Sequence, residues 1–297
     1  MEIPTHCTLC PRACGADRTC TRGLCGGGPQ LRAARAALHF WEEPCISGTR
    51  GSGTVFFSGC TLQCCYCQNY RISAENFGKE LTVPQLRDIF LRLQEEGAHN
   101  INLVTATHYL PWVLEALALA RPQLAIPIVY NTGGYETPET IAALDGVADI
   151  WLTDLKYCSP ELSSEYSHAP DYFAVASEAA RQMCTQAGPP VFDREGILQK
   201  GVIVRHLALP GALADTRAVL DFMAHELPKE GFLVSLMSQY TPFYKAFEHK
   251  SLSRRISTYE YRQAVNYAVD LGLCQGFMQE KSSAKEEYTP PFDLNGL

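Results

Sequence analysis

Along most of the chain, two hydrophobic patterns alternate. Short runs rich in valine, isoleucine, leucine and phenylalanine are each followed by a longer segment in which apolar residues recur every three or four positions. The first pattern is typical of buried strands and the second of amphipathic helices. The strand-like runs are TVFFSGC (54–60), INLVTAT (101–107), IPIVYNTGG (126–134), ADIWLTDLKY (148–157), GVIVRHLALPG (201–211) and FLVSLMSQYT (232–241). The helical segments that follow them are 83–98, 111–120, a short one opening at 137, 171–187, 214–227 and 258–271.

Six strand–helix pairs in series predict a parallel sheet, because parallel neighbours need a crossover that is usually a helix. Each run also ends in polar or unusual residues, and the carboxyl ends of the strands build the active site of α/β barrels. We therefore predict an α/β fold, a partial (β/α)6 barrel of the TIM type, with an open doubly wound sheet as the alternative. No Gly-x-Gly-x-x-Gly follows the first run, which argues against a dinucleotide site there.

The N-terminal residues lack this periodicity. Residues 1–30 are rich in cysteine, glycine and proline, and we interpret them as a small metal-binding extension that is ordered by a metal or by docking. Residues 31–53 are interpreted as a connector with a Gly/Ser-rich end, and residues 54–297 as the barrel.

The charge and composition of the chain indicate the compartment in which the protein lies and the classes of molecule it could bind. The formal net charge of −7 argues against nucleic acid, whose binding needs a basic surface. No uncharged apolar run reaches the roughly 18 residues of a membrane span, and the first residues lack the layout of a secretory signal. A cytoplasmic protein without a membrane partner is predicted. Its thirteen cysteines are then expected to serve metal binding or redox chemistry rather than disulfides.

Three cysteines follow the first strand-like run with the spacing C-x3-C-x2-C: Cys60, Cys64 and Cys67. Three thiolates suit an iron–sulfur cluster with one open iron, since a fully ligated cubane takes four. A zinc site and buried structural thiols are the alternatives. Structural zinc takes four ligands, and Cys65 would have difficulty folding back onto the ion that Cys64 binds. We interpret Cys65 as a packing thiol, and Tyr66 as a cover for the cluster or a contact for an adenine.

A second set of cysteines lies in the N-terminal extension. Four thiolates in a segment too small to fold by burial alone predict a zinc site or a second iron–sulfur cluster. Unligated thiols are the alternative, and Cys20 is a spare. The four predicted ligands are Cys7, Cys10, Cys14 and Cys25.

The C-x3-C-x2-C spacing, with an aromatic residue before the last cysteine, resembles the radical S-adenosylmethionine (SAM) superfamily. The stretches GSGTVFFSGCTLQCCYCQNYRIS, NTGGYE, DLKY, VRHLALPG and LMSQYTP, with the opening CTLCPRACG, resemble one branch of it, the uncharacterised relatives of pyruvate formate-lyase activating enzyme. The resemblance implies an oxidoreductase in which a 4Fe–4S cluster binds SAM and cleaves it reductively. The resulting 5′-deoxyadenosyl radical abstracts hydrogen from a substrate.

The resemblance also implies where SAM is held. Members of the superfamily often place Gly-Gly-Glu at the end of strand two, near the methionine ammonium, whereas this chain has Thr105-Ala106-Thr107-His108. The hydroxyls and carbonyls of Thr105 and Thr107 are expected to accept hydrogen bonds in its place. Glu136, in GGYE after strand three, is interpreted as a surface carboxylate that leads a helix.

Further positions match those of activating enzymes. Asp154 and Lys156 match a pair around the cofactor and would share one face of a strand; a purely structural ion pair is the alternative. Arg205 matches the family position on strand five, whereas His206 is interpreted as a core histidine. Gln239 is expected near the adenosine.

Asn131 and Thr132 fall where activating enzymes place polar contacts near the methionine carboxylate. Asn131 replaces an acidic residue there, which argues against a cation site. The same branch implies a glycyl radical protein as substrate and a low-potential electron donor such as flavodoxin or ferredoxin. A small molecule or another peptide as substrate, and a metal-binding or RNA-associated module without catalysis, are the alternatives.

Overall fold

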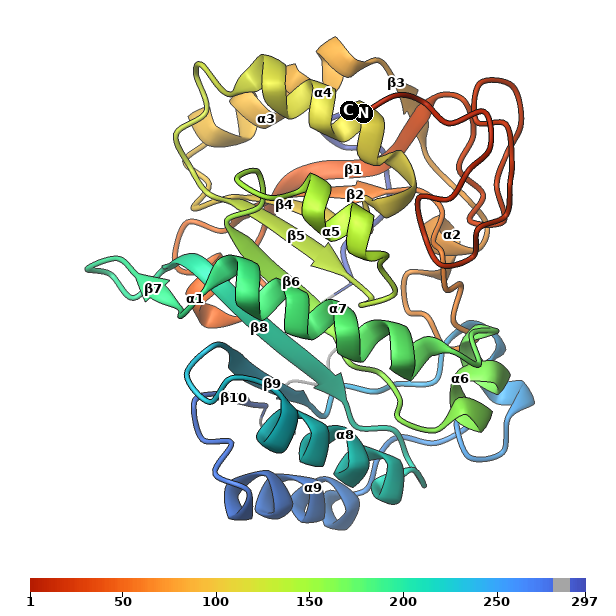
Figure 1. Ribbon diagram of the computed structural model, residues 1–297, viewed down its shortest axis with the longest axis vertical. Helices are drawn as coiled ribbons and strands as arrows, with labels where there is room; N and C mark the ends of the chain where they lie inside the picture. The colour runs from red at the N-terminus through yellow and green to blue at the C-terminus, as the bar shows by residue number, and fades with distance from the viewer. Residues whose placement is uncertain (280–288) are drawn as a thin grey trace.

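The computed structural model describes residues 1–279 and 289–297, and its centre is a curved, mainly parallel sheet (Figure 1). The strand order is β10-β9-β8-β6-β5-β4-β2-β1-β3, and β7 (Val191–Phe192) pairs with β8. The parallel strands are β2 (Ser52–Phe57), β4 (Ile101–Val104), β5 (Ile128–Thr132), β6 (Ile150–Asp154), β8 (Leu198–Leu207), β9 (Leu233–Met237) and β10 (Gly276–Met278). The predicted α/β fold with a partial barrel is confirmed.

Most of the longer helices join the parallel strands and lie on one face of the sheet in Figure 1. Two of them begin with a capping box, in which a Thr or Ser side chain and a Gln or Glu three residues later satisfy the first backbone groups. In residues 1–279 and 289–297, no helix is long and apolar enough to cross a membrane. The longer helices are α3 (Val83–Glu95), α4 (Leu110–Ala120), α5 (Pro138–Ala143), α6 (Pro160–Ser167), α7 (Tyr172–Ala187), α8 (Leu213–Glu226) and α9 (Thr258–Asp270).

Residues 31–39, inside the segment interpreted as a connector, form a strand of the same sheet. This strand, β1 (Leu31–His39), runs antiparallel to β2 and to the short β3 (Lys79–Leu81). Its sequence LRAARAALH is rich in alanine, which favours strands weakly, so local propensity does not reveal it. Its hydrogen bonds to β2 and the burial of its apolar residues hold it in place.

The interior face of the sheet is apolar at the strand beginnings and polar at the strand ends. Residues such as Val129, Ile150 and Ile203 form an inner cluster with Cys45 and Ile46 of α1 (Pro44–Ser47). Side chains alternate along a strand, so the same face carries Asn131, Asp154 and Arg205 further along. The short helix α1 therefore fills the amino-terminal half of the interior and leaves a polar half above it.

The segment 289–297 lies along the far edge of the sheet. Ala36 of β1 donates its N–H to Asn295, and the carbonyl of Ala34 accepts from Leu294. Phe292 packs with Phe56 and other residues of the interior face. One wall of the interior is thus made by residues close to the end of the sequence.

Candidate functional site

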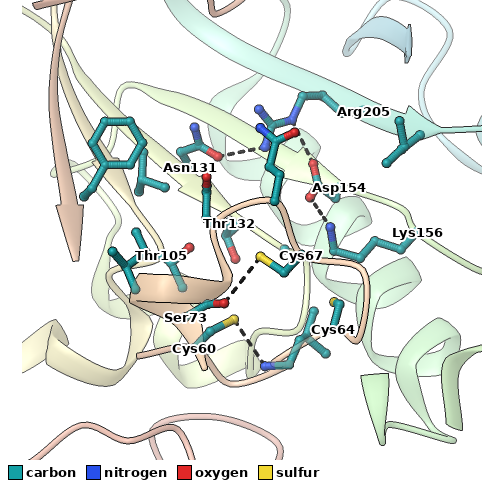
Figure 2. Close-up of a pocket in the computed structure, with 18 of the residues that line it drawn as sticks. Cys60, Cys64, Cys67, Ser73, Thr105, Asn131, Thr132, Asp154, Lys156 and Arg205 are labelled. Atoms are coloured by element: carbon teal, nitrogen blue, oxygen red, sulfur yellow. Dashed lines mark hydrogen bonds and ion pairs between the residues drawn. The ribbon is translucent and has the colours of Figure 1, made fainter. Parts of the chain in front are cut away.

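The loop between β2 and α2 (Tyr70–Ser73) carries the cysteine triplet to one cavity. Cys60, Cys64 and Cys67 line this cavity of about 250 Å³ at the carboxyl ends of the strands. Figure 2 shows the three cysteines along one side and charged residues from neighbouring strands along the other. The structure therefore brings the triplet together with most of the predicted SAM-binding residues.

Each of the three thiols receives a hydrogen bond from the protein. Hydrogen bonds to sulfur and burial are the means by which a protein sets the reduction potential of an iron–sulfur cluster. The donors are the backbone N–H of Leu62 to Cys60 at 3.4 Å, Oγ of Ser167 to Cys64 at 3.0 Å, and Oγ of Ser73 to Cys67 at 3.4 Å.

The surroundings disfavour free thiolates at Cys60 and Cys67. Burial, with a smaller contribution from the Cys64 thiol, raises the pKa of Cys60 to about 12. Burial also raises the pKa of Cys67. Thiolates here therefore need bound cations, and metal coordination deprotonates a thiol outright. In the described parts of the chain, no three Cys, His, Asp or Glu side chains converge as ligands of a single metal ion do. A cubane instead binds each thiolate through a different iron, so the donor set fits a cluster with one open iron.

Cys65 lies on the same loop but is not among the residues that line the cavity. Its backbone N–H donates to the carbonyl of Tyr166, and its carbonyl accepts from Lys245. Tyr66 does line the cavity, and its hydroxyl accepts a hydrogen bond from Tyr157 at 2.6 Å. The loop thus places Cys64, Tyr66 and Cys67 at the cavity and Cys65 in the packing around it.

Asp154, at the end of β6, lies between two cations (Figure 2). Nζ of Lys156 is 2.6 Å from one carboxylate oxygen and Nε of Arg205 is 2.8 Å from the other. Burial alone raises the pKa of Asp154, but Arg205 and Lys156 outweigh it and leave that pKa below its usual value. Nη2 of Arg205 also donates to Oδ1 of Asn131 at 2.7 Å. The cavity wall therefore holds a carboxylate, an ammonium and a guanidinium in ionised form.

Glu42 belongs to the segment interpreted as a connector and is not among the site residues predicted from the sequence. Its carboxylate accepts from the amides of Asn102 at 3.1 Å and Asn131 at 3.2 Å, and lies 3.4 Å from Nη1 of Arg205. Burial raises the pKa of Glu42, and Arg205 opposes that rise. Glu42 lines the same cavity. Only the charged pair Glu42–Glu43 in an otherwise aromatic and apolar stretch could have drawn attention to it.

Thr105, Thr132 and Gln239 also line the cavity. Thr105 follows β4 and has a φ of 58°, in the left-handed region. A residue with a side chain costs on the order of 1 kcal/mol there, and such conformations gather at functional sites. The backbone turns at this position, and the residues after it leave the cavity.

Glu136 is not a surface carboxylate, so that expectation is wrong: the residue is only 2% exposed. Thr107 lies beside it rather than among the cavity-lining residues. One carboxylate oxygen of Glu136 accepts from the hydroxyls of Thr107 (2.6 Å) and Thr132, and the other has no hydrogen-bond partner among the described residues. Burial raises the pKa of Glu136 to about 7, although both hydroxyls lower it.

The free energy of unfolding should therefore depend on pH through Glu136. A carboxyl whose pKa is about 7 in the folded chain and about 4.5 when unfolded stabilises the fold at low pH. That contribution is lost as pH rises from about 4.5 through about 7. We expect Glu136→Gln to remove this slope and, at pH 8, to be more stable than the parent by as much as about 3 kcal/mol. Urea denaturation of both proteins at pH 5 and pH 8 measures it; equal slopes in the two proteins would contradict the assignment.

His206, next to Arg205 on β8, is buried in the outer core. One ring nitrogen lies 2.7 Å from the carbonyl of Leu155 and the other 3.0 Å from the hydroxyl of Thr216. Burial lowers the pKa of His206 to about 4. His206 is therefore a buried core histidine in which both ring nitrogens have hydrogen-bond partners, as the sequence predicted.

The N-terminal extension lies beside the triplet's loop in Figure 1. The backbone carbonyl of Cys25 accepts a hydrogen bond from the N–H of Cys60 at 2.9 Å, which links the two cysteine sets directly. Cys20 is exposed. Of the four predicted ligands, Cys7, Cys10 and Cys25 are buried and Cys14 is half-buried.

Part of this chain matches a known protein family, and most of it matches one relative. The family model described as Radical SAM superfamily matches residues 54–183, which confirms the resemblance predicted from the cysteine spacing. An uncharacterized protein of Methanocaldococcus jannaschii is 29% identical over 283 residues, which are 92% of this chain and 77% of that protein.

The solved structures that resemble this chain have low sequence identity to it. A domain of pyruvate-formate lyase-activating enzyme from Bacteroides vulgatus is 14% identical with a TM-score of 0.39, over 57% of this chain and 89% of that one. SuiB from Streptococcus suis, bound to S-adenosylmethionine, is 12% identical with a TM-score of 0.49, over 74% of this chain and 48% of that one. SuiB bound to its precursor peptide SuiA is 12% identical with a TM-score of 0.47, over 71% and 43%.

Proposed function

We propose that this chain, whose residues 54–183 match the radical SAM superfamily, is an enzyme that binds a 4Fe–4S cluster through Cys60, Cys64 and Cys67 and SAM in the adjoining cavity. When bound, the cluster supplies the electron that cleaves SAM to a 5′-deoxyadenosyl radical, which abstracts hydrogen from the substrate. The observation that carries the proposal is that three hydrogen-bonded thiols and a row of ionised side chains line one cavity.

The ionised side chains would bind the amino-acid part of SAM. Lys156 and Arg205 can attract a carboxylate, and Asp154 and the carbonyl oxygens near Thr105 can accept from an ammonium. Asn131 contacts Arg205 and would lie near the same carboxylate. Lys156 and Arg205 are held in place by their ion pairs with Asp154, so these groups would lose little conformational freedom on binding.

The aromatic side of the cavity would hold the adenosine and exclude water. Tyr66 packs edge-to-face against Tyr240, with ring centroids 5.8 Å apart, and both rings line the cavity. Gln239 lies beside them and offers an amide to the adenosine. Exclusion of water matters because a carbon radical reacts with any neighbouring group that can give up hydrogen.

We propose a glycyl radical protein as the substrate, with hydrogen taken from a backbone glycine. The resemblance of several strand-end stretches to activating enzymes supports this choice. The strand order also ends at β10 and β3 without closing on itself in the described residues, and an incomplete barrel would suit a protein loop as substrate. A low-potential donor such as flavodoxin or ferredoxin would supply the electrons.

The proposed function is tested by reconstituting the full chain with iron and sulfide without oxygen. After reduction with dithionite and addition of SAM, we expect release of 5′-deoxyadenosine, measured by liquid chromatography. An intact cluster with no release would favour a metal-binding module without catalysis.

The substrate is tested separately in the same reaction. A glycyl radical protein encoded beside this one should give a doublet glycyl signal in electron paramagnetic resonance after mixing. Release of 5′-deoxyadenosine without that signal would point to a small molecule or another peptide instead.

A further inference from the structure

Arg18 is a completely buried cation in the N-terminal extension. It is 0% exposed, and no ion pair found among residues 1–279 and 289–297 includes it. Nη2 donates to the carbonyl of Gly28 at 3.1 Å, and the one hydrogen-bond partner of Nη1 in the described parts of the chain is the sulfur of Cys7, at 3.9 Å. Nε has no hydrogen-bond partner in the described structure. The guanidinium therefore leaves donors unused in a place where water does not reach.

Such a group is costly unless an anion accompanies it. Arginine stays charged in proteins, and burying an unpaired charge costs several kcal/mol. The rings of Tyr109 and Trp112 lie 5.9 and 5.6 Å from the guanidinium carbon. Each such contact contributes about 1–2 kcal/mol, so the two rings offset only part of the cost. The remaining part requires negative charge close to Arg18.

The groups around Arg18 that can carry negative charge are cysteines. Besides the contact with Cys7, Arg18 interacts electrostatically with the thiols of Cys14 and Cys25. Gly23 marks the same place: a Cβ on it would lie 3.3 Å from the sulfur of Cys14, 3.4 Å from that of Cys25 and 4.0 Å from Cδ of Arg18. The two sulfurs and the arginine thus surround one small residue.

We propose that Cys7, Cys10, Cys14 and Cys25 bind a metal centre as thiolates and that Arg18 is the buried counter-ion that holds it. Four thiolates exceed the charge of zinc or of an iron–sulfur core, so either centre is an anion that accepts hydrogen bonds at its sulfurs. The N–H groups of Arg18 that lack a partner in the described structure could donate these hydrogen bonds to the sulfurs. In the described residues no three Cys, His, Asp or Glu side chains converge as the ligands of one zinc ion do, which favours a cluster, because a cluster binds each thiolate through its own iron.

The centre would connect the extension to the loop of the cysteine triplet. The carbonyl of Cys25 accepts from Cys60, and that of Leu24 from the side chain of Gln63 at 3.0 Å. Gly59 has a φ of +90°, and a Cβ on it would lie 2.5 Å from the Cys25 oxygen. The extension therefore contacts the triplet's loop at the backbone, and the centre would keep this contact whatever reaction the barrel catalyses.

Metal analysis of the full chain tests the site without reference to activity. In a Cys60→Ala, Cys64→Ala, Cys67→Ala background, metal bound after anaerobic loading reports on the extension alone. One sample receives zinc and another receives iron with sulfide, which separates the two kinds of centre. We expect one centre per chain in one of the samples. We also expect its loss in Cys25→Ser and its retention in Cys20→Ser, a matched change of an exposed thiol. If the background variant does not fold, Cys25→Ser and Cys20→Ser are compared in the parent chain instead. Cys25→Ser should then bind one metal centre fewer per chain than Cys20→Ser.

Arg18 is tested by metal affinity, measured by competition with a chelator. Arg18→Met should weaken binding by about 10–100-fold, as the loss of partners around metal ligands usually does. Arg18→Lys should restore part of it, and Arg22→Met, at an exposed arginine of the same segment, should change nothing. Absence of metal from both folded samples, or equal affinities for the parent and Arg18→Met, would overturn the proposal.

Discussion

Replacing Cys64 by alanine should reduce the release of 5′-deoxyadenosine to background, a fall of at least about 10³-fold. The Cys64 sulfur lines the cavity and takes a hydrogen bond from Ser167, so its loss would leave a cluster with two protein ligands in a buried site. Chromatographic assay of the reconstituted, dithionite-reduced protein with SAM measures the effect. Iron and sulfide content of the same sample should fall as well.

Cys65→Ala is the matched control, because Cys65 is the next residue on the same loop. Its side chain is absent from the cavity wall, and its hydrogen bonds to Tyr166 and Lys245 are made by the backbone. We expect most of the activity and a full complement of iron to remain. If Cys64→Ala turns over like the parent, or if the two variants behave alike, the ligand assignment is incorrect.

Replacing Asp154 by alanine should lower the free energy of unfolding by about 3–5 kcal/mol, measured by urea denaturation without cofactors. Asp154 bonds to Lys156 at 2.6 Å and to Arg205 at 2.8 Å, and each of these side chains is at most one-fifth exposed. Removal of the shared carboxylate leaves both cations desolvated, with Glu42 and Glu43 as the acids that still interact with Arg205 in the described structure. Asp154→Asn should cost less, since it keeps the volume and one acceptor.

An exposed ion pair provides the comparison for Asp154. Glu178 pairs with Arg181 on the surface of α7 at 3.5 Å, and such pairs contribute at most about 1 kcal/mol. Glu178→Ala should therefore shift the urea midpoint only slightly. Similar losses for Glu178→Ala and Asp154→Ala would mean that the buried network contributes little to stability.

Strong local patterns explain which elements could be predicted. The segments 101–107 and 148–157 contain β4 and β6, and the segment 171–187 contains α7. Their apolar periodicity is continuous, and a run buried on both faces has few alternatives to a strand in a parallel sheet. β1 was not predicted as a strand, because its alanines favour no element strongly and its partner β2 lies beyond an intervening helix.

Glu136 shows why an isolated side chain is harder to place. It comes just before a helix that starts with Thr137 and Pro138, a pattern typical of exposed helix starts. The N-terminal extension covers this start: Thr140 donates to the carbonyl of Leu9 at 2.8 Å, and Arg12 lies over the ring of Tyr135. A segment more than a hundred residues away thus turns a surface position into a buried one.

The succession of strands and helices and the cysteine spacing that indicates the family can be recognised in the sequence, because both depend on residues close together in the chain. Which charges meet depends on how distant segments fold together. Glu42 contacts Arg205 and Arg18 lies among cysteines through folding contacts that no local pattern contains. The physical reason is that the effect of a charge depends on its distance to other charges and on its exclusion from water, and the folded chain sets both.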